Sequence, residues 1–155
     1  MITNACLRAR LTGTVFVGLP AKEAFALFTP DGERAWAKGW EPRFPNPDGE
    51  ETEPGTVFLT SHSGSESIWT VTECEAGVSI GYAVTTPGER GGLVKVVCEP
   101  GPNGTRATVT YDLTALSAEA NEGVRRFAAG YPTFLDHWER SIAEASGHGS
   151  HRSSS

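Results

Sequence analysis

The strongest constraint on the fold is a stretch near the end of the chain with the periodicity of one long amphipathic helix. Apolar side chains recur there at spacings of three and four residues, which places them on one helical face. They are Val124, Phe127, Tyr131, Phe134, Leu135, Trp138 and Ile142. At roughly 1.5 Å per residue, a helix from Ser117 to Gly147 would be about 45 Å long. Such a helix needs a large apolar partner surface, and we expect a curved sheet to provide it.

Gly130 and Pro132 interrupt the middle of this stretch. A proline inside a helix removes one hydrogen bond and costs about 3 kcal/mol, so we predict a kink that wraps the helix round the sheet. The alternative is a pair of helices that flank a break. Ser117 is the expected N-cap, and Glu122 with Arg126 is the expected ion pair one turn apart.

The chain before this stretch reads as strands, because apolar and polar residues alternate in it. The predicted strands cover residues 7–17, 56–62, 67–75, 78–86, 92–99 and 105–114. Turn signals separate the last five so closely that only hairpin connections fit, which predicts an antiparallel meander. Two short helices, over 20–28 and 29–36, are expected after the first strand. A proline-rich loop from Trp40 to Gly55 follows them and is long enough to be a lid.

Composition limits the class of protein. The chain has 155 residues, enough for one domain with a substantial core, and a formal net charge of −6 without any basic block. Nucleic-acid binding and docking on anionic membranes are therefore not expected. The short apolar runs exclude a transmembrane helix, and residues 1–4 lack the features of a signal peptide. We expect a cytoplasmic domain over residues 1–146 and a disordered tail over 147–155, in which His148 and His151 are solvated rather than metal-binding.

The three cysteines also fit a reducing compartment. Their number is odd, and no two of them have the CxxC spacing. Cys74 and Cys98 lie inside predicted strands, so we expect them to be buried free thiols.

The order of these elements resembles the START-like superfamily, also called SRPBCC. Segments similar to its small bacterial members are FALFTPDGERAW (25–36), GWEP (39–42), IWTVT (68–72), TPG (86–88), VTYDLTALS (109–117) and WER (138–140). The resemblance covers about residues 9–145 and implies the α+β helix-grip fold. That fold is a curved antiparallel sheet of about six strands wrapped on a long C-terminal helix. The superfamily includes lipid carriers, hormone receptors, polyketide cyclases and chaperone activators, so the fold alone does not select an activity.

No catalytic signature is present: the chain has no GxSxG, no HExxH, no phosphate-binding glycine loop and no zinc-type cysteine spacing. Two polar residues are candidates for acid–base chemistry. His62 ends the second predicted strand on the face of Phe58, where it is either functional or simply exposed. Tyr82 shares a face with Ile80, and its hydroxyl either donates inside a cavity or reaches solvent.

A cavity between sheet and long helix is the expected ligand site. Its expected lining residues are Trp40, Phe44, His62, Trp69, Tyr82, Phe127, Tyr131 and Phe134, although the aromatic ones would serve equally as core. Glu33 and Arg34 are expected to cap and pair near the short helices, and Arg90 to be a loop charge or a guard of the cavity mouth. We expect no metal and no cofactor.

Binding of a small hydrophobic or aromatic molecule is the first functional hypothesis. The alternative is an enzyme like the polyketide cyclases and dehydratases, with His62 and Tyr82 as acid and base on a polyketide or aromatic substrate. The third is a protein-interaction module like the chaperone activators, for which the outer sheet face, with Lys95 and Glu99, offers no apolar patch. The chain is expected to be a monomer or homodimer.

Overall fold

The computed structural model describes residues 5–154 of the chain, with side chains described for residues 5–146. Six strands form one antiparallel sheet in the order β1-β6-β5-β4-β3-β2. They are β1 (Arg8–Val17), β2 (Val57–His62), β3 (Ser65–Glu75), β4 (Ser79–Thr86), β5 (Arg90–Gly101) and β6 (Gly104–Ala115). The predicted meander is confirmed, because strands β2 to β6 follow one another through hairpins.

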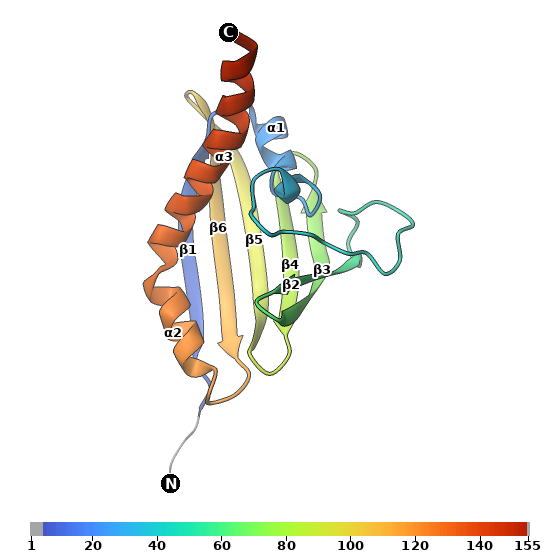
Figure 1. The fold of residues 1–155 in the computed structure, drawn as a ribbon, viewed down its shortest axis with the longest axis vertical. Coiled ribbons are helices and arrows are strands. Elements are labelled where there is room, and N and C mark those ends of the chain that lie inside the picture. The colour runs from blue at the N-terminus through green and yellow to red at the C-terminus, as the bar shows by residue number, and fades with distance from the viewer. Residues whose placement is uncertain (1–4, 155) are drawn as a thin grey trace.

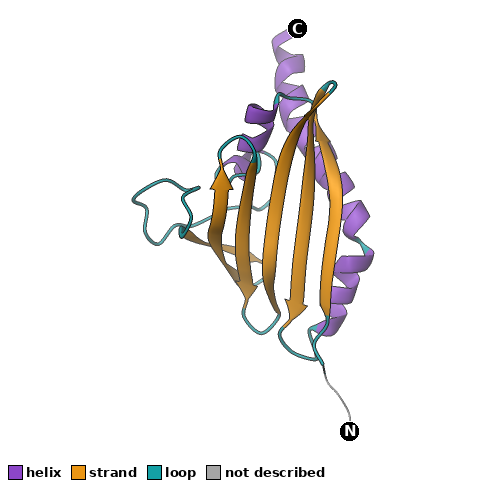
Figure 2. Ribbon diagram, turned by 180° about the vertical axis from the view of Figure 1, so that it is seen from behind, coloured by secondary structure: helices purple, strands orange, loops and turns teal. Residues whose placement is uncertain are grey.

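The helices form a second layer on one face of this sheet, as Figure 1 shows, and the opposite face is bare in Figure 2. They are α1 (Ala21–Ala26), the 3₁₀ turn η1 (Gly32–Ala35), α2 (Asn121–Ala129) and α3 (Tyr131–Ser154). The second short helix expected over 29–36 is thus a single 3₁₀ turn. Thr29 starts it, because its hydroxyl accepts a hydrogen bond from the Gly32 amide at 3.0 Å.

The C-terminal helix is interrupted where the sequence suggested a kink. The prediction of one helix from Ser117 was wrong: α2 ends before Gly130, and α3 starts at Tyr131. Pro132 has no amide hydrogen to continue the pattern of α2, which explains a break at this point. Ser117 lies in the turn before α2, where its hydroxyl accepts from the Ala120 amide at 3.2 Å.

Two further details of this region differ from expectation. Glu122 pairs with Arg125 at 3.3 Å, three residues away, and not with Arg126. The backbone of α3 runs to Ser154, past Gly147, where we expected a disordered tail. The side chains of His148 and His151 lie outside the described residues, as do residues 1–4, on which the expectation about a signal peptide depends.

Helix α3 packs closely against the half of the sheet formed by β1 and β6. Gly13 of β1 permits the approach, since a Cβ atom there would meet Cδ1 of Leu135 at 2.5 Å. The Tyr131 hydroxyl donates to the Val109 carbonyl of β6 at 2.7 Å, which fixes the start of α3 on the same half. The other half of the sheet is covered instead by η1 and the loop that follows it (Figure 1).

That loop is bound to the free edge of the sheet. Arg43 and Leu59 of β2 exchange two backbone hydrogen bonds of 2.9 Å, which forms an isolated antiparallel bridge. The Trp40 indole donates to the Pro30 carbonyl at 2.7 Å and so ties the loop to the turn between α1 and η1. The predicted lid segment is therefore held in place at both points.

The remaining expectations concern cysteines and membranes. Cys98 is buried and Cys74 half-buried, whereas Cys6 is exposed, and all three are free thiols. Within the described residues, no helix combines the length and the apolar character needed to cross a bilayer.

Candidate ligand-binding cavity

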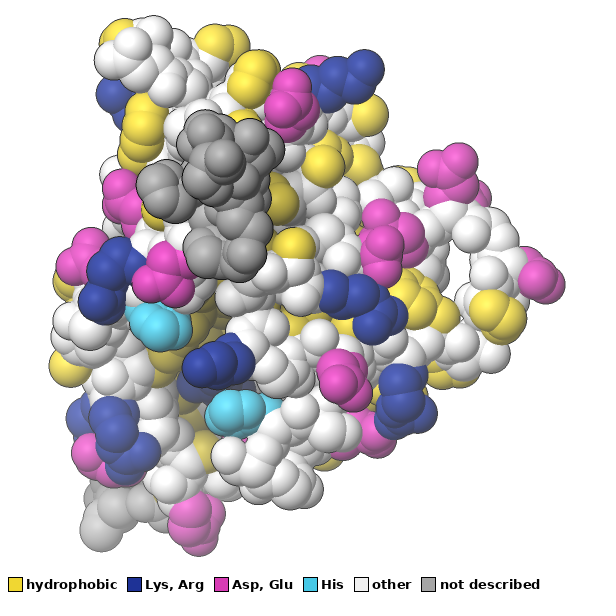
Figure 3. Space-filling view, turned by 45° about the horizontal axis from the view of Figure 1, so that its top comes forward, with side chains coloured by type: hydrophobic (Ala, Val, Ile, Leu, Met, Phe, Trp, Pro, Cys, Tyr) yellow, Lys and Arg dark blue, Asp and Glu magenta, His cyan; other side chains and the backbone are white. Residues whose placement is uncertain are grey.

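A cavity of about 420 Å³ lies between the helical layer and the half of the sheet that α3 leaves free. Its lining residues come from η1 and the next loop, from strands β2 to β6, and from α3. This volume is within the range of about 300–1,000 Å³ that is usual for sites that bind small molecules. In Figure 3, hydrophobic side chains show at the bottom of a hollow that histidine, lysine and arginine side chains border.

Aromatic rings make up much of the wall. The six that line the cavity are Trp40, Trp69, Tyr82, Tyr111, Phe134 and Trp138. They form two groups of touching rings. In the first group, Trp69 contacts Trp40 at 5.4 Å and Tyr82 at 5.7 Å between ring centroids. In the second, Phe134 contacts Tyr111 at 5.7 Å and Trp138 at 5.2 Å.

Five of the eight residues expected at the site line this cavity: Trp40, His62, Trp69, Tyr82 and Phe134. The other three are not among its lining residues. Phe44 packs on Phe58 with ring centroids 5.4 Å apart, and the hydroxyl of Tyr131 is bound to the sheet. Phe127 lies below the Arg90 guanidinium, at 5.0 Å from its carbon to the ring centroid. Whether the five contact a ligand stays a prediction.

Several polar groups of the wall already have partners. The Tyr82 hydroxyl donates to the Phe28 carbonyl at 2.8 Å, and burial raises the pKa of this phenol far above its usual value. The Trp69 indole donates to the Thr60 hydroxyl at 3.0 Å. Because the phenol proton of Tyr82 is engaged in fastening the sheet to the end of α1, this residue is poorly placed for the acid–base role considered from sequence.

Glu33 of η1 is the lining residue that the sequence reasoning assigned wrongly. Arg34 pairs with Asp31 at 2.8 Å as expected, but Glu33 is only 9% exposed and faces the cavity. Its carboxyl has no hydrogen-bond or ion-pair partner among the described residues, and burial raises its pKa well above 4.5. No sequence signal indicated this burial, because Glu33 lies in a single 3₁₀ turn that is covered only by tertiary packing.

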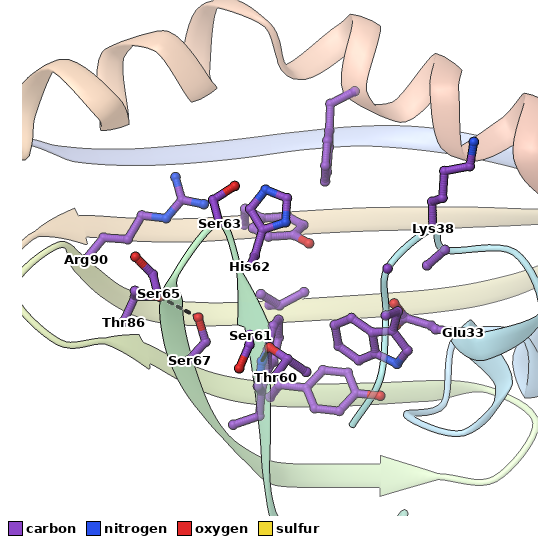
Figure 4. A pocket seen from close by; sticks show the side chains of 18 of the residues that line it. Glu33, Lys38, Thr60, Ser61, His62, Ser63, Ser65, Ser67, Thr86 and Arg90 are labelled. Atoms are coloured by element: carbon purple, nitrogen blue, oxygen red, sulfur yellow. Dashed lines mark hydrogen bonds between the residues drawn. The ribbon is translucent and has the colours of Figure 1, made fainter. Parts of the chain in front are cut away.

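Basic groups gather at the other end of the cavity. Arg90 starts β5 and His62 ends β2, and Figure 4 shows the Arg90 guanidinium directed toward His62 and Ser63. Arg90 makes no ion pair among the described residues. Nearby hydroxyls are paired with one another or with an acid: Ser67 with Thr86 at 2.7 Å, and Ser65 with Glu89 at 2.6 Å. In residues 5–146, no three His, Cys, Asp or Glu side chains are grouped to hold a metal.

Fold and cavity define an α+β helix-grip protein with an internal pocket. Residues 8–141 match the sequence profile of the family described as polyketide cyclase / dehydrase and lipid transport, and the chain belongs to this family. The resemblance to the START-like superfamily is thereby confirmed. No curated protein matches the chain.

Solved structures agree on the fold. An uncharacterized protein from Rhizobium leguminosarum is similar with a TM-score of 0.66 and 17% identity, over 90% of this chain and 97% of that one. DynU16, a protein of the dynemicin biosynthetic locus, has a TM-score of 0.60 and 18% identity over 84% of this chain and 46% of its own. The Aha1 dimer from Colwellia psychrerythraea has a TM-score of 0.61 and 13% identity, over 86% and 96%.

At such identities the structures establish the fold and no activity. Family and fold together support hydrophobic-ligand binding or cyclase activity in general terms.

Proposed function

We propose that the protein binds a small, flat hydrophobic or aromatic molecule in the cavity beneath α3. One observation carries this proposal: two groups of aromatic rings, one around Trp69 and one around Phe134, line a single cavity of about 420 Å³. Aromatic rings favour flat partners, which they contact by stacking or edge-to-face packing. The family description, which includes lipid transport, supports the same class of ligand.

Three polar donors of this wall do not oppose apolar binding. The indole and phenol donors of Trp40, Trp69 and Tyr82 already have protein acceptors, so an apolar ligand would leave none of them unpaired. Burial of apolar surface contributes roughly 25 cal/mol per Å², and most of the ligand's surface would be removed from water in such a pocket.

A cavity-filling substitution tests the proposal. Val96 lines the cavity from β5, whereas its neighbour Val97 points to the outer face of the sheet. Val96→Phe should fill part of the cavity and weaken the binding of neutral N-phenyl-1-naphthylamine by about tenfold or more. The matched control Val97→Phe should bind this dye like the wild type. Dye fluorescence and tryptophan quenching measure the affinity, and urea unfolding verifies that both variants fold.

Equal binding by wild type and Val96→Phe would place the dye outside the cavity and refute the proposal. The result does not depend on knowing the natural ligand.

The second candidate is a cyclase-like or dehydratase-like enzyme, favoured by the unpaired carboxyl of Glu33 and by His62 at the mouth. In such an enzyme, removal of a positioned acid or base should lower turnover about 10²–10⁴-fold with little effect on affinity. The third hypothesis, a protein-interaction module, has weaker support. Among the exposed apolar residues on the described strands, Val57 of β2 and Ile68 of β3 alone lie on neighbouring strands, whereas Phe16 and Leu93 lie apart on β1 and β5.

A further inference from the structure

The chemistry of the ligand can be specified further, on the basis of the proposed function. We propose that the ligand is an aromatic carboxylate whose far end carries a carbonyl oxygen. Arg90 and His62 bind the carboxylate at the mouth, and the carboxyl group of Glu33 donates a hydrogen bond to the carbonyl oxygen at the other end.

Arg90 is the group that selects an anion. Its guanidinium is half-buried against the Phe127 ring, yet it has no acidic partner among the described residues. The adjacent acid, Glu89, accepts a hydrogen bond from Ser65 instead. A guanidinium offers two parallel N–H groups that match a carboxylate, and packing on a ring preorganises it for this contact.

The charges round the cavity agree with an anionic ligand. The chain as a whole has a formal net charge of −6, but the lining of the cavity is formally balanced, with Lys38 and Arg90 against Glu33 and Glu89. Arg90 lies at the mouth with His62, and Lys38 on the side of Glu33 (Figure 4). Basic groups at the mouth attract an anion and repel a cation. A basic amine would also suit the buried carboxyl of Glu33, but the charge at the mouth disfavours it as the ligand.

Glu33 supplies the contact at the opposite end. Figure 4 shows Arg90 and Glu33 on opposite sides of the cavity, with His62 between them. The charged Glu33 carboxyl would raise the pKa values of the Tyr82 and Tyr111 phenols, so both phenols lie near it. Lys38 lies on the same side of the cavity (Figure 4), but no cation pairs with Glu33 among the described residues. Burial among such groups favours the protonated acid, which is a hydrogen-bond donor. A carbonyl oxygen accepts that bond, whereas a second carboxylate would be repelled once the acid ionised.

Four naphthalene probes separate the two contacts. 6-Acetyl-2-naphthoate carries both groups, 2-naphthoate only the carboxylate, 2-acetylnaphthalene only the ketone, and 2-naphthylmethylamine a cation. Titration calorimetry should show the first binding about tenfold more tightly than 2-acetylnaphthalene, the usual effect of one charge-assisted hydrogen bond.

Substitutions assign each contact to a residue. Arg90→Gln should weaken the two carboxylate probes about tenfold and leave 2-acetylnaphthalene unchanged. Glu33→Met should weaken the two ketone probes about threefold to tenfold and leave 2-naphthoate unchanged, while Glu33→Gln, which keeps a donor, should bind like the wild type. The exposed residues Arg106 and Glu23 provide matched controls as Arg106→Gln and Glu23→Gln.

The outcomes distinguish this inference from the function on which it rests. If 2-acetylnaphthalene and 6-acetyl-2-naphthoate bind equally and Arg90→Gln changes neither, the inference is wrong and the apolar site remains. Tightest binding of 2-naphthylmethylamine, lost in Glu33→Gln, would also overturn it. If none of the four probes nor the neutral dye binds, both proposals are wrong.

Discussion

Glu33→Gln should make the protein more stable at neutral and alkaline pH. Burial raises the pKa of the Glu33 carboxyl well above 4.5 in the folded protein, whereas the unfolded chain restores its ordinary value. Between those two pKa values, the folded state binds one proton more than the unfolded state. The contribution of the Glu33 carboxyl to stability is fully present below the pKa of the unfolded state and is lost as the pH rises toward the pKa of the folded state. Between the two pKa values, the free energy of unfolding of the wild type should therefore fall by about 1.4 kcal/mol per pH unit relative to that of Glu33→Gln.

Urea unfolding followed by tryptophan fluorescence measures this effect. The quantity is the free energy of unfolding of the wild type minus that of Glu33→Gln, in a series of buffers from about pH 5 to about pH 9. The subtraction cancels groups common to both proteins, such as Asp112, whose pKa Arg8 lowers. Glu23→Gln is the control for removal of a carboxyl charge, since this exposed residue lies on α1 outside the cavity.

A wild-type-minus-Glu33→Gln difference that stays constant across the series would show that the Glu33 carboxyl is already ionised in the folded protein at the lowest pH, whether solvated or paired. That result would refute the description of Glu33 as a buried, unpaired acid, and with it the donor role in the ligand proposal.

Two further predictions concern side chains on the cavity wall. Trp138→Ala should lower the free energy of unfolding by about 3–5 kcal/mol, because the Trp138 ring contacts Trp36 at 5.1 Å and Phe28 at 6.2 Å between ring centroids. A loss below about 1 kcal/mol in urea unfolding would show that Trp138 is peripheral. Tyr82→Phe should lower the free energy of unfolding by about 1–3 kcal/mol, because it leaves the Phe28 carbonyl without its donor. It should not change any conversion of a bound molecule. Lost turnover with unchanged stability would restore Tyr82 as a catalytic acid.

Much of the fold could be predicted because its determinants are local. In β6, Ala107, Val109 and Tyr111 alternate with polar residues, and the first two are fully buried. The turns from β2 to β6 are short, so the order of these five strands along the chain also determines their order in the sheet. The break before α3 was harder to place, because a proline permits either a kink or a new helix.

The candidate site could be predicted only in part, because its shape depends on contacts between distant residues. His62 and Trp69 follow from strand alternation. The position of the cavity depends instead on Gly13, which lets Leu135 approach β1 and thereby leaves space over the other half of the sheet. Glu33 was missed because an acid in a short helical turn is usually solvated, and only the tertiary packing round η1 buries it.

The bridge between Arg43 and Leu59 has a consequence for how copies of this chain meet. A free edge strand such as β2 offers unpaired amides and carbonyls to another molecule, and is a common starting point of aggregation. The loop occupies that edge at one position. The next equivalent pair would set Pro45 opposite Val57, where proline has no amide hydrogen, so the loop cannot itself extend into a seventh strand. The same short segment thus blocks the edge and resists the growth of sheet from one molecule to the next.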